Sequence, residues 1–225
     1  MSLRPPDPPG VQPYPGDALA LARFERERRG FVELSGPDVV SVVLGRTTPL
    51  ADVLLEACAE DGVTVFRRKG GGGAVVLAPG MIVITVCFPI GSLPDVEVLM
   101  RELSGVVVRA LEPLAPGTCS AAAAPLGVRG FGDVCVGDRK ILGSSLYLRR
   151  EVGLFQASLL VMDCAGVVRR YLAHPSREPA YRAGRAHGEF MTSLEEQGYA
   201  TDVKLLERQI ALAYGVWLTS DLLQT

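Results

Sequence analysis

Four consecutive glycines, Gly70–Gly73, form the segment of the chain that is best suited to binding a ligand. Three cations, Arg67–Lys69, stand directly before them, and Ala74-Val75 follow. Backbone without side chains can approach a ligand closely, adopt positive φ and present N–H groups to an anion. The preceding cations favour a carboxylate or a phosphate. A flexible surface turn would explain the same residues, so the loop alone favours neither interpretation.

Two familiar phosphate-binding motifs are excluded for this loop. No Lys-Ser or Lys-Thr follows the last glycine, as a P-loop would require. A dinucleotide-binding G-x-G-x-x-G turn connects a strand to a helix, whereas this loop leads into a β-branched, strand-like segment.

A second segment with chemical potential is Gly137–Ser145, in which Lys140 begins an apolar strand. A lysine in that position is unusual unless its charge has a partner. The alternative is a hairpin turn with solvated Arg139 and Lys140, and the segment taken alone favours that turn.

The elements that must position these segments follow from periodicity and turn residues. Helices are expected where apolar residues recur at helical spacing, and strands where β-branched runs end at glycine or proline. Gly70 to Pro94 contains no charged residue, but Pro79-Gly80 divides it, so we expect a hairpin of two buried strands and no membrane span. The expected helices are Asp17–Arg29, Leu50–Ala59, Asp95–Leu111, Ala165–Leu172, a short one capped by Thr192 or Ser193, and Val203–Trp217. The expected strands are Val39–Leu44, Val63–Phe66, the two in Val75–Phe88, Asp133–Val136, Lys140–Tyr147 and Gly153–Met162.

This order of elements predicts an α/β protein of the α+β type, with a mixed, largely antiparallel sheet and packed helices. Residues 1–16, rich in proline, are expected to form an extended, poorly ordered arm, and residues 17–225 a single domain. The net charge of −2 gives no electrostatic footprint for nucleic acid.

Five widely spaced cysteines and two histidines limit the chemistry further. The odd number of cysteines and the lack of a C-x-x-C motif argue against a disulfide framework and favour a reducing cytoplasm. Two histidines are too few for a histidine-rich metal site.

Taken together, the two segments and their neighbours resemble lipoate–protein ligase A and its relatives. That family carries an R-R-x-S-G-G-G-A-V loop, a G-x-x-D segment, a D-R-K-x-x-G-x-S/A strand and an H-H-G-T-L-L strand, followed by P-x-R-x-P-x-Y-R-x-x-R-x-H. The matching segments here, in the same order over roughly Val39 to Leu194, are Arg67–Val75, Gly130–Asp133, Asp138–Ser145, Leu154–Leu160 and Pro175–His187.

The resemblance implies the biotin/lipoate ligase catalytic-domain fold and an enzyme that activates lipoate with ATP and Mg²⁺. The lipoyl-adenylate then transfers its acyl group to a lysine of a carrier domain, either the E2 subunit of a dehydrogenase complex or the H protein of glycine cleavage. The resemblance implies that Lys140 is the catalytic residue and contacts the acyl carbonyl and the phosphate. Asp133 would lie near the nucleotide and metal, and Arg68 near the phosphate or carboxylate. The implied substrate-binding residues are Arg67, Arg68, Gly70, Gly71, Gly72, Gly73, Ala74, Val75, Gly143 and Ser144.

Several positions depart from the family pattern. Gly70 replaces the serine of the loop, Leu77 and Ala78 stand where ligases have His-Asp, and Gln156 replaces a histidine. Each change removes a polar group from the expected site. The chain also ends at Thr225, without the small C-terminal accessory domain of bacterial ligases, so a separate accessory subunit is expected if the chain is a ligase.

Two alternatives therefore stay open. The first is an ATP-independent octanoyl- or lipoyl-transferase that forms a thioester on a cysteine, with Cys119 as the nucleophile and Cys135 as the next candidate. A nucleophilic cysteine needs nearby cations that lower its pKa, and neither position shows them in sequence. The second alternative is a lipoyl-binding relative that kept the fold and lost the chemistry. His187, with Arg182 and Arg185, is expected to belong to a structural loop network rather than to meet a phosphate.

Overall fold

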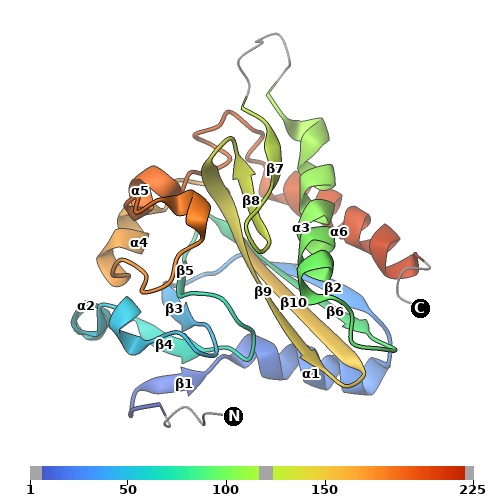
Figure 1. The fold of residues 1–225 in the computed structure, drawn as a ribbon, viewed down its shortest axis with the longest axis horizontal. Helices are drawn as coiled ribbons and strands as arrows, with labels where there is room; N and C mark the ends of the chain where they lie inside the picture. The colour runs from blue at the N-terminus through green and yellow to red at the C-terminus, as the bar shows by residue number, and fades with distance from the viewer. Residues whose placement is uncertain (1–6, 117–123, 221–225) are drawn as a thin grey trace.

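The computed structural model of the chain describes residues 7–116 and 124–220 (Figure 1). The fold contains two β-sheets, one of six strands and one of four. The larger has the strand order β2-β6-β10-β9-β8-β7 and is antiparallel throughout; the smaller has the order β1-β4-β3-β5, with β4 parallel to both of its neighbours. The predicted mixed, largely antiparallel sheet with packed helices is confirmed.

The bounds of the elements are as follows. The strands are β1 Val11–Pro13, β2 Phe31–Ser35, β3 Ser41–Leu44, β4 Thr64–Arg67, β5 Val75–Leu77, β6 Met81–Pro89, β7 Leu126–Arg129, β8 Asp133–Val136, β9 Arg139–Arg149 and β10 Val152–Leu160. The helices are α1 Pro15–Glu27, α2 Leu55–Glu60, α3 Val96–Leu111, α4 Ala165–Tyr171, α5 His187–Phe190 and α6 Val203–Thr219, with 3₁₀ turns η1 Leu50–Asp52, η2 Glu112–Leu114 and η3 Ala180–Arg182.

Strand β6 shows why this part of the chain carries no charge. Its even-numbered residues, such as Ile84, pack into the main core beneath α3 and α6. Its odd-numbered residues face the other side, where Val83 packs against the small sheet and Cys87 against α1. A strand that is buried on both faces needs apolar side chains at successive positions. Helices α3 and α6 therefore cover one face of the large sheet, and α1 and the small sheet cover the other (Figure 1).

The expected hairpin over Val75–Phe88 is wrong in its pairing. The turn at Pro79-Gly80 does form, with Gly80 at φ 90°, but it carries the chain from one sheet to the other. Strand β5 pairs with β3, and β6 pairs with β2 and β10. Two consecutive strands on either side of a turn fit a hairpin locally, and only the long-range partners distinguish the two arrangements.

Three further expectations need correction. Val11–Pro13 of the expected N-terminal arm forms β1, because its backbone completes the edge of the small sheet beside β4, and α1 begins at Pro15; residues 1–6 lie outside the description. Leu50–Ala59 is not one helix but η1 followed by α2. Ser193 and Glu196 form reciprocal capping bonds, as predicted, but they close a turn and not a helix.

Strand β2 is absent from the sequence prediction. Its alternation of buried and exposed residues is short and includes Glu33 and Ser35, which weakens the apolar signal. In contrast, α3 begins as expected, because the Asp95 carboxylate accepts the N–H groups of Glu97 and Val98.

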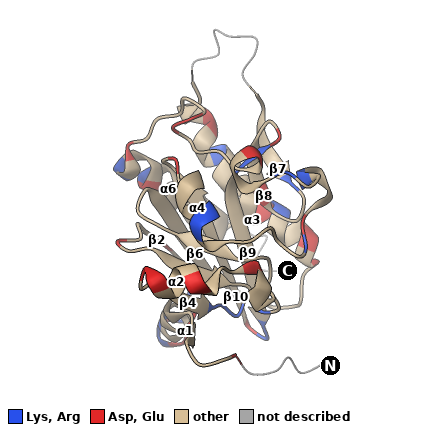
Figure 2. Ribbon diagram, turned by 90° about the vertical axis from the view of Figure 1, so that its left-hand side faces the viewer, with Lys and Arg blue, Asp and Glu red and all other residues tan. Residues whose placement is uncertain are grey.

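Ion pairs join the two short outer helices α2 and α4. Arg170 of α4 contacts both Glu60 and Asp61 at the end of α2, and Figure 2 shows these blue and red segments facing each other. Elsewhere in that view basic and acidic residues are interspersed. Among the described residues, no helix is long and apolar enough to cross a membrane.

Candidate functional site

A cavity of about 620 Å³ lies between the two sheets. Its size is typical of a small-molecule site. Apolar residues of β3, β5, β6 and β10 form one part of the wall, and the glycine loop forms another. Lys140 and Asp133 and the segment from 173 to 191 complete it. Of the residues implied in substrate binding, catalysis or metal binding, those that line this cavity are Arg68, Gly71, Gly72, Gly73, Ala74, Val75, Asp133, Lys140, Gly143 and Ser144.

Arg68 holds the glycine loop from inside. Its guanidinium donates to the carbonyls of Gly71 (2.7 Å from Nη2), Gly73 (2.9 Å from Nη2) and Val43 (3.1 Å from Nη1). The Nε atom is a further donor to Gly71, at 3.2 Å. Burial lowers the pKa of Arg68 to about 10, so the group stays charged at neutral pH. All three guanidinium nitrogens donate to backbone carbonyls, so Arg68 acts as a clamp on the loop. Its implied position near a phosphate or carboxylate stays a prediction.

The segment that follows β3 holds the loop from the other side. Thr48 donates its hydroxyl hydrogen to the Gly72 carbonyl (2.8 Å), and the Arg46 N–H donates to the Gly70 carbonyl (2.8 Å). A Cβ on Gly45 would lie 2.0 Å from the Gly72 oxygen, so only glycine fits there. Sequence reasoning missed these residues. The available signal was a Gly-Arg-Thr-Thr-Pro sequence at the end of an apolar strand.

Two residues implied in substrate binding do not line the cavity. Arg67 forms an ion pair with Asp7 (2.9 Å) and donates to the carbonyls of Gly45 and Thr48, so it fixes the entry to the loop. Gly70 rests on β9, where an added Cβ would lie 3.0 Å from the Ser145 hydroxyl oxygen. A side chain on residue 70 would require Ser145 or the loop to shift by a few tenths of an ångström, so glycine allows the loop to lie close against β9.

Lys140 and Asp133 form the charged centre of the site. They come from adjacent strands, and Lys140 Nζ lies 2.7 Å from Asp133 Oδ1. Tyr181 donates its hydroxyl hydrogen to Asp133 Oδ2 at 2.7 Å. Burial and the neighbouring Asp133 raise the pKa of Tyr181, so the phenol stays a donor at neutral pH. The ammonium also lies over Gly143, where an added Cβ would approach Nζ to 2.9 Å.

The Lys140 ammonium and the glycine loop both lie against strand β9. Gly143 lies under Lys140 Nζ and Ser145 lies under Gly70. Residues two apart on a strand lie on the same face, about 7 Å from each other. The two segments singled out in the sequence are thus brought together at one end of the cavity.

Two polar residues near the site, Ser144 and Asp17, form hydrogen bonds with the backbone. Ser144 donates its hydroxyl hydrogen to the Gly132 carbonyl (2.7 Å). Asp17 accepts the Lys69 N–H at 2.6 Å; burial raises the pKa of Asp17, and the Gln156 side-chain amide is among the groups that oppose this rise. Gln156 thus replaces the expected histidine with an amide near that carboxyl group, but its Nε2 makes no hydrogen bond with the described residues. Leu77 and Ala78 are buried apolar residues, and Leu77 lines the cavity.

The segment from 173 to 191 lines another side of the cavity, next to Lys140. Arg185 belongs to the structural network expected from sequence, because it donates to Asp138 (2.8 Å) and to the carbonyls of Tyr181 and Arg182. His187 nevertheless lines the cavity. Burial and the nearby Arg182, His174 and Lys140 lower its pKa to about 4, so the imidazole is neutral at pH 7.

The cysteines in the described part of the chain show no sign of activation. Cys58, Cys87, Cys135 and Cys164 are free and buried. Burial raises the pKa of each, that of Cys87 to about 12, which disfavours the thiolate. Cys135 lies beside Lys140 in the sheet, but its thiol donates to the Tyr181 oxygen. Cys119 lies outside the described residues.

The carboxylate in the cavity wall next to Lys140 that could bind a magnesium ion is that of Asp133. Within residues 7–116 and 124–220, no group of three His, Cys, Asp or Glu side chains is placed to hold a metal. Magnesium is commonly carried by one or two carboxylates together with substrate phosphates and water. Asp133 fits that lesser role, although Lys140 and Tyr181 already contact its two oxygens.

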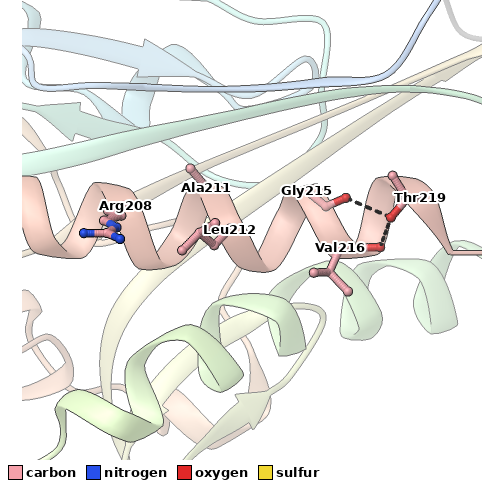
Figure 3. Close-up of a pocket in the computed structure, with 6 residues that line it drawn as sticks. All are labelled: Arg208, Ala211, Leu212, Gly215, Val216 and Thr219. Carbon is pink, nitrogen blue, oxygen red and sulfur yellow. Dashed lines mark hydrogen bonds between the residues drawn. The ribbon is translucent and has the colours of Figure 1, made fainter.

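A second hollow, on α6, lacks the features of a site. Its lining residues all come from this one helix, and the Thr219 hydroxyl donates back to the helix carbonyls (Figure 3). No groups from different elements converge on it, so the cavity between the sheets is the candidate site. The residues that line the hollow are Arg208, Ala211, Leu212, Gly215, Val216 and Thr219.

Comparison with known proteins adds a family to this geometry. The family model for the lipoyl protein ligase A/B catalytic domain matches residues 37–214. No curated protein matches the chain significantly in sequence.

Solved structures share the fold at low sequence identity. A lipoate–protein ligase A bound with ATP superposes with a TM-score of 0.70 at 20% identity, over 92% of this chain and 83% of that one. A bi-partite lipoate protein ligase from Thermoplasma acidophilum, described with its E2 lipoyl domain, gives 0.69 at 18% identity, over 92% and 81% of the chains. LipL1 of P. falciparum in complex with lipoate gives 0.65 at 17% identity, over 92% and 60%.

Proposed function

The chain belongs to the lipoyl protein ligase A/B catalytic-domain family, and on that premise we propose that it transfers a lipoyl-type acyl group to a lysine of a carrier domain. In the proposed reaction the lipoate carboxylate first attacks the α-phosphate of ATP, which gives lipoyl-adenylate and releases pyrophosphate. The lysine amine of the carrier then attacks the acyl carbonyl, forms the amide and releases AMP.

The observation that carries this proposal is the position of Lys140. Its ammonium is fixed by Asp133 in the wall of the cavity, one strand repeat from the glycine loop. During acyl transfer, negative charge develops on the carbonyl oxygen and on the departing phosphate. A cation that is already in place stabilises that charge without reorganisation.

The apolar part of the cavity suits an acyl chain. Val75 and Leu77 of β5 and Val83 of β6 line it, and none carries a polar group that would compete for the substrate. The buried Arg68 keeps the loop backbone in place beside this wall. We propose that the loop N–H groups face the acyl carboxylate and that the chain lies between the sheets.

Nucleotide and metal belong to the same proposal. One of the structural neighbours is a ligase bound with ATP, and two have a bound lipoyl ligand in their descriptions. Asp133 would hold Mg²⁺, which would neutralise phosphate charge when bound.

The proposed partner is a lipoyl carrier domain. A neighbour from Thermoplasma acidophilum is described with an E2 lipoyl domain and as bi-partite, which supports an E2 domain and a separate accessory subunit as the proteins to test first. The H protein of glycine cleavage is the second carrier to test.

The experiment compares two acyl donors by the intact mass of the carrier. One reaction contains the chain, lipoate, Mg²⁺-ATP and a lipoyl domain; the other contains octanoyl-carrier protein and no ATP. Carrier modification that requires ATP supports the proposal. Modification from the acyl carrier alone, with a thioester trapped on Cys119 and lost in Cys119→Ser, would replace it with the transferase. Thermal stabilisation by lipoate without any modification, with or without an accessory subunit, would reduce the chain to a lipoyl-binding protein.

A further inference from the structure

Arg182 is a buried arginine in the cavity wall that the proposed acyl transfer does not use. It ends η3 and is 4% exposed. Its Nε donates to the Arg185 carbonyl at 2.9 Å and lies 3.4 Å from Glu178 Oε2, while its guanidinium carbon lies 4.8 Å from the Phe190 ring centre. One face of the group is therefore held by its own loop.

The other end of the same guanidinium is unsatisfied. Nη2 of Arg182 is buried and has no hydrogen-bond partner among the described residues. Buried donors nearly always have a partner, and leaving one without is unfavourable, most of all for a charged group. Arg68, the other buried arginine of the cavity wall, shows the contrast, because each of its three nitrogens donates to a carbonyl. An unsatisfied cationic donor in a cavity wall is suited to an anion that enters with a ligand.

His187 and Lys140 lie at the same end of the cavity. Lys140 pairs with Met191 in an isolated bridge, and its carbonyl accepts the Thr192 N–H at 2.9 Å, so the end of α5 is fixed to the start of β9. His187 is close enough to Arg182 and Lys140 for both charges to lower its pKa. A neutral imidazole beside two cations can donate a hydrogen bond to an anion without adding a charge of its own.

We propose that Arg182 and His187 form a phosphate subsite of the cavity, on the side of Lys140 away from the glycine loop. The acyl group would then lie between the glycine loop and Lys140, and the phosphate between Lys140 and Arg182. Glu178, which contacts Arg182 through Nε, partly balances its charge and leaves Nη2 for the ligand. The binding of phosphate does not depend on the proposed function, but its role in carrying the phosphate of the acyl donor rests on it.

Two sources could supply such a phosphate. A nucleotide brings it in the ATP-dependent reaction, and a phosphopantetheine arm brings it in transfer from an acyl carrier. Isothermal titration of the wild-type chain with AMP in one arm and with phosphopantetheine in the other identifies the source. Binding of either ligand through Arg182 supports the subsite, and binding of neither overturns it.

The decisive variants are Arg182→Lys and Arg185→Lys. Both keep the charge and stand in the same loop, but Arg185 does not line the cavity, and its guanidinium contacts Asp138 and two carbonyls. Removal of a charge-assisted hydrogen bond should weaken the affinity of Arg182→Lys about tenfold or more, with less than a threefold change in Arg185→Lys. Equal weakening in both, or no weakening in Arg182→Lys, would show that Arg182 only holds the loop together.

A second measurement uses the wild-type chain, so it does not depend on whether a variant folds. The ¹H–¹³C signal of His187 in the wild-type chain reports its titration, and a phosphate between the two cations should shift its pKa upward from about 4. The surrounding groups that enter this titration are Arg182, Lys140 and His174. An unchanged pKa with ligand bound would overturn the subsite.

Failure of the subsite and failure of the proposed function are separable. A carrier that is modified normally by Arg182→Lys, with unchanged AMP affinity, would remove the subsite and leave the function. Phosphate binding through Arg182 without modification of any carrier would do the opposite.

Discussion

Lys140 and Asp133 face each other across β8 and β9, with Nζ and Oδ1 2.7 Å apart, and Tyr181 holds the second oxygen of Asp133. The ammonium is therefore neither solvated at a turn nor free to rotate. Asp133 holds the Lys140 ammonium over Gly143, in the wall of the cavity. This ion pair fixes the position of the ammonium, and with it the place where the ammonium could stabilise a developing negative charge.

Replacement of Lys140 by alanine should lower the rate of carrier modification about 10²–10³-fold, because a fixed donor to the developing charge is removed. The measurement is single-turnover transfer to a lipoyl domain, followed by carrier mass. Lys204→Ala, at an exposed position on α6, is the matched control and should keep the wild-type rate. Full activity in Lys140→Ala would show that the proposed catalytic role is wrong.

Replacement of Arg68 by lysine should destabilise the fold by about 2–3 kcal/mol, since one ammonium cannot reach the carbonyls of Val43, Gly71 and Gly73 together. Urea unfolding measures the loss, and the affinity for lipoate should fall with it because the loop loses its clamp. Lys69→Ala, with an exposed side chain in the same loop, is the control. If Arg68→Lys binds lipoate weakly but unfolds like the wild type, the arginine contacts the ligand instead.

Replacement of Gly45 by alanine should destabilise the fold by about 3 kcal/mol, the upper end of typical overpacking, because the new Cβ would meet the backbone of Gly72. Gly73→Ala provides the comparison: its Cβ would have nothing within 4 Å, and its stability should stay within about 0.5 kcal/mol of the wild type. Equal unfolding midpoints for the two variants would contradict the packing of the glycine loop against the end of β3.

His187 predicts a pH dependence of stability. Its pKa is about 4 in the folded chain and near 6.5 when unfolded, so between these values the unfolded state binds more protons. Stability should therefore be complete above about pH 6.5 and fall as the pH drops toward 4. His187 is partly exposed, so we expect a loss of about 1–2 kcal/mol rather than the full effect of the shift.

The measurement is the free energy of unfolding in urea at intervals from pH 7.5 to 4.5, for the wild type and for His187→Gln. The variant should show a flatter curve over this range. Asp17, whose pKa burial raises, acts in the opposite direction at the acid end and is common to both proteins. Parallel curves for the two proteins would contradict the neutral, half-buried state of His187.

The sequence by itself determined those features that depend on local pattern. Uncharged, apolar runs predicted β6 and β10, apolar residues at helical spacing predicted α3, and an unusual run of glycines and a lysine on an apolar strand identified both halves of the site. These signals are local because they depend only on residues that are near one another in the chain. The order of the motifs along the chain was sufficient to identify the family.

Only the tertiary structure decided which side chains are free to act. Arg67 and Arg68 look alike in sequence, but one pairs with Asp7 and the other is enclosed by the glycine loop. Strands β5 and β6 follow one another and still belong to different sheets. The contact of Tyr181 with Asp133 joins residues 48 positions apart. Such contacts depend on how distant segments pack, and no local period encodes that, because each segment has several partners that would satisfy its own hydrogen bonds and burial equally well.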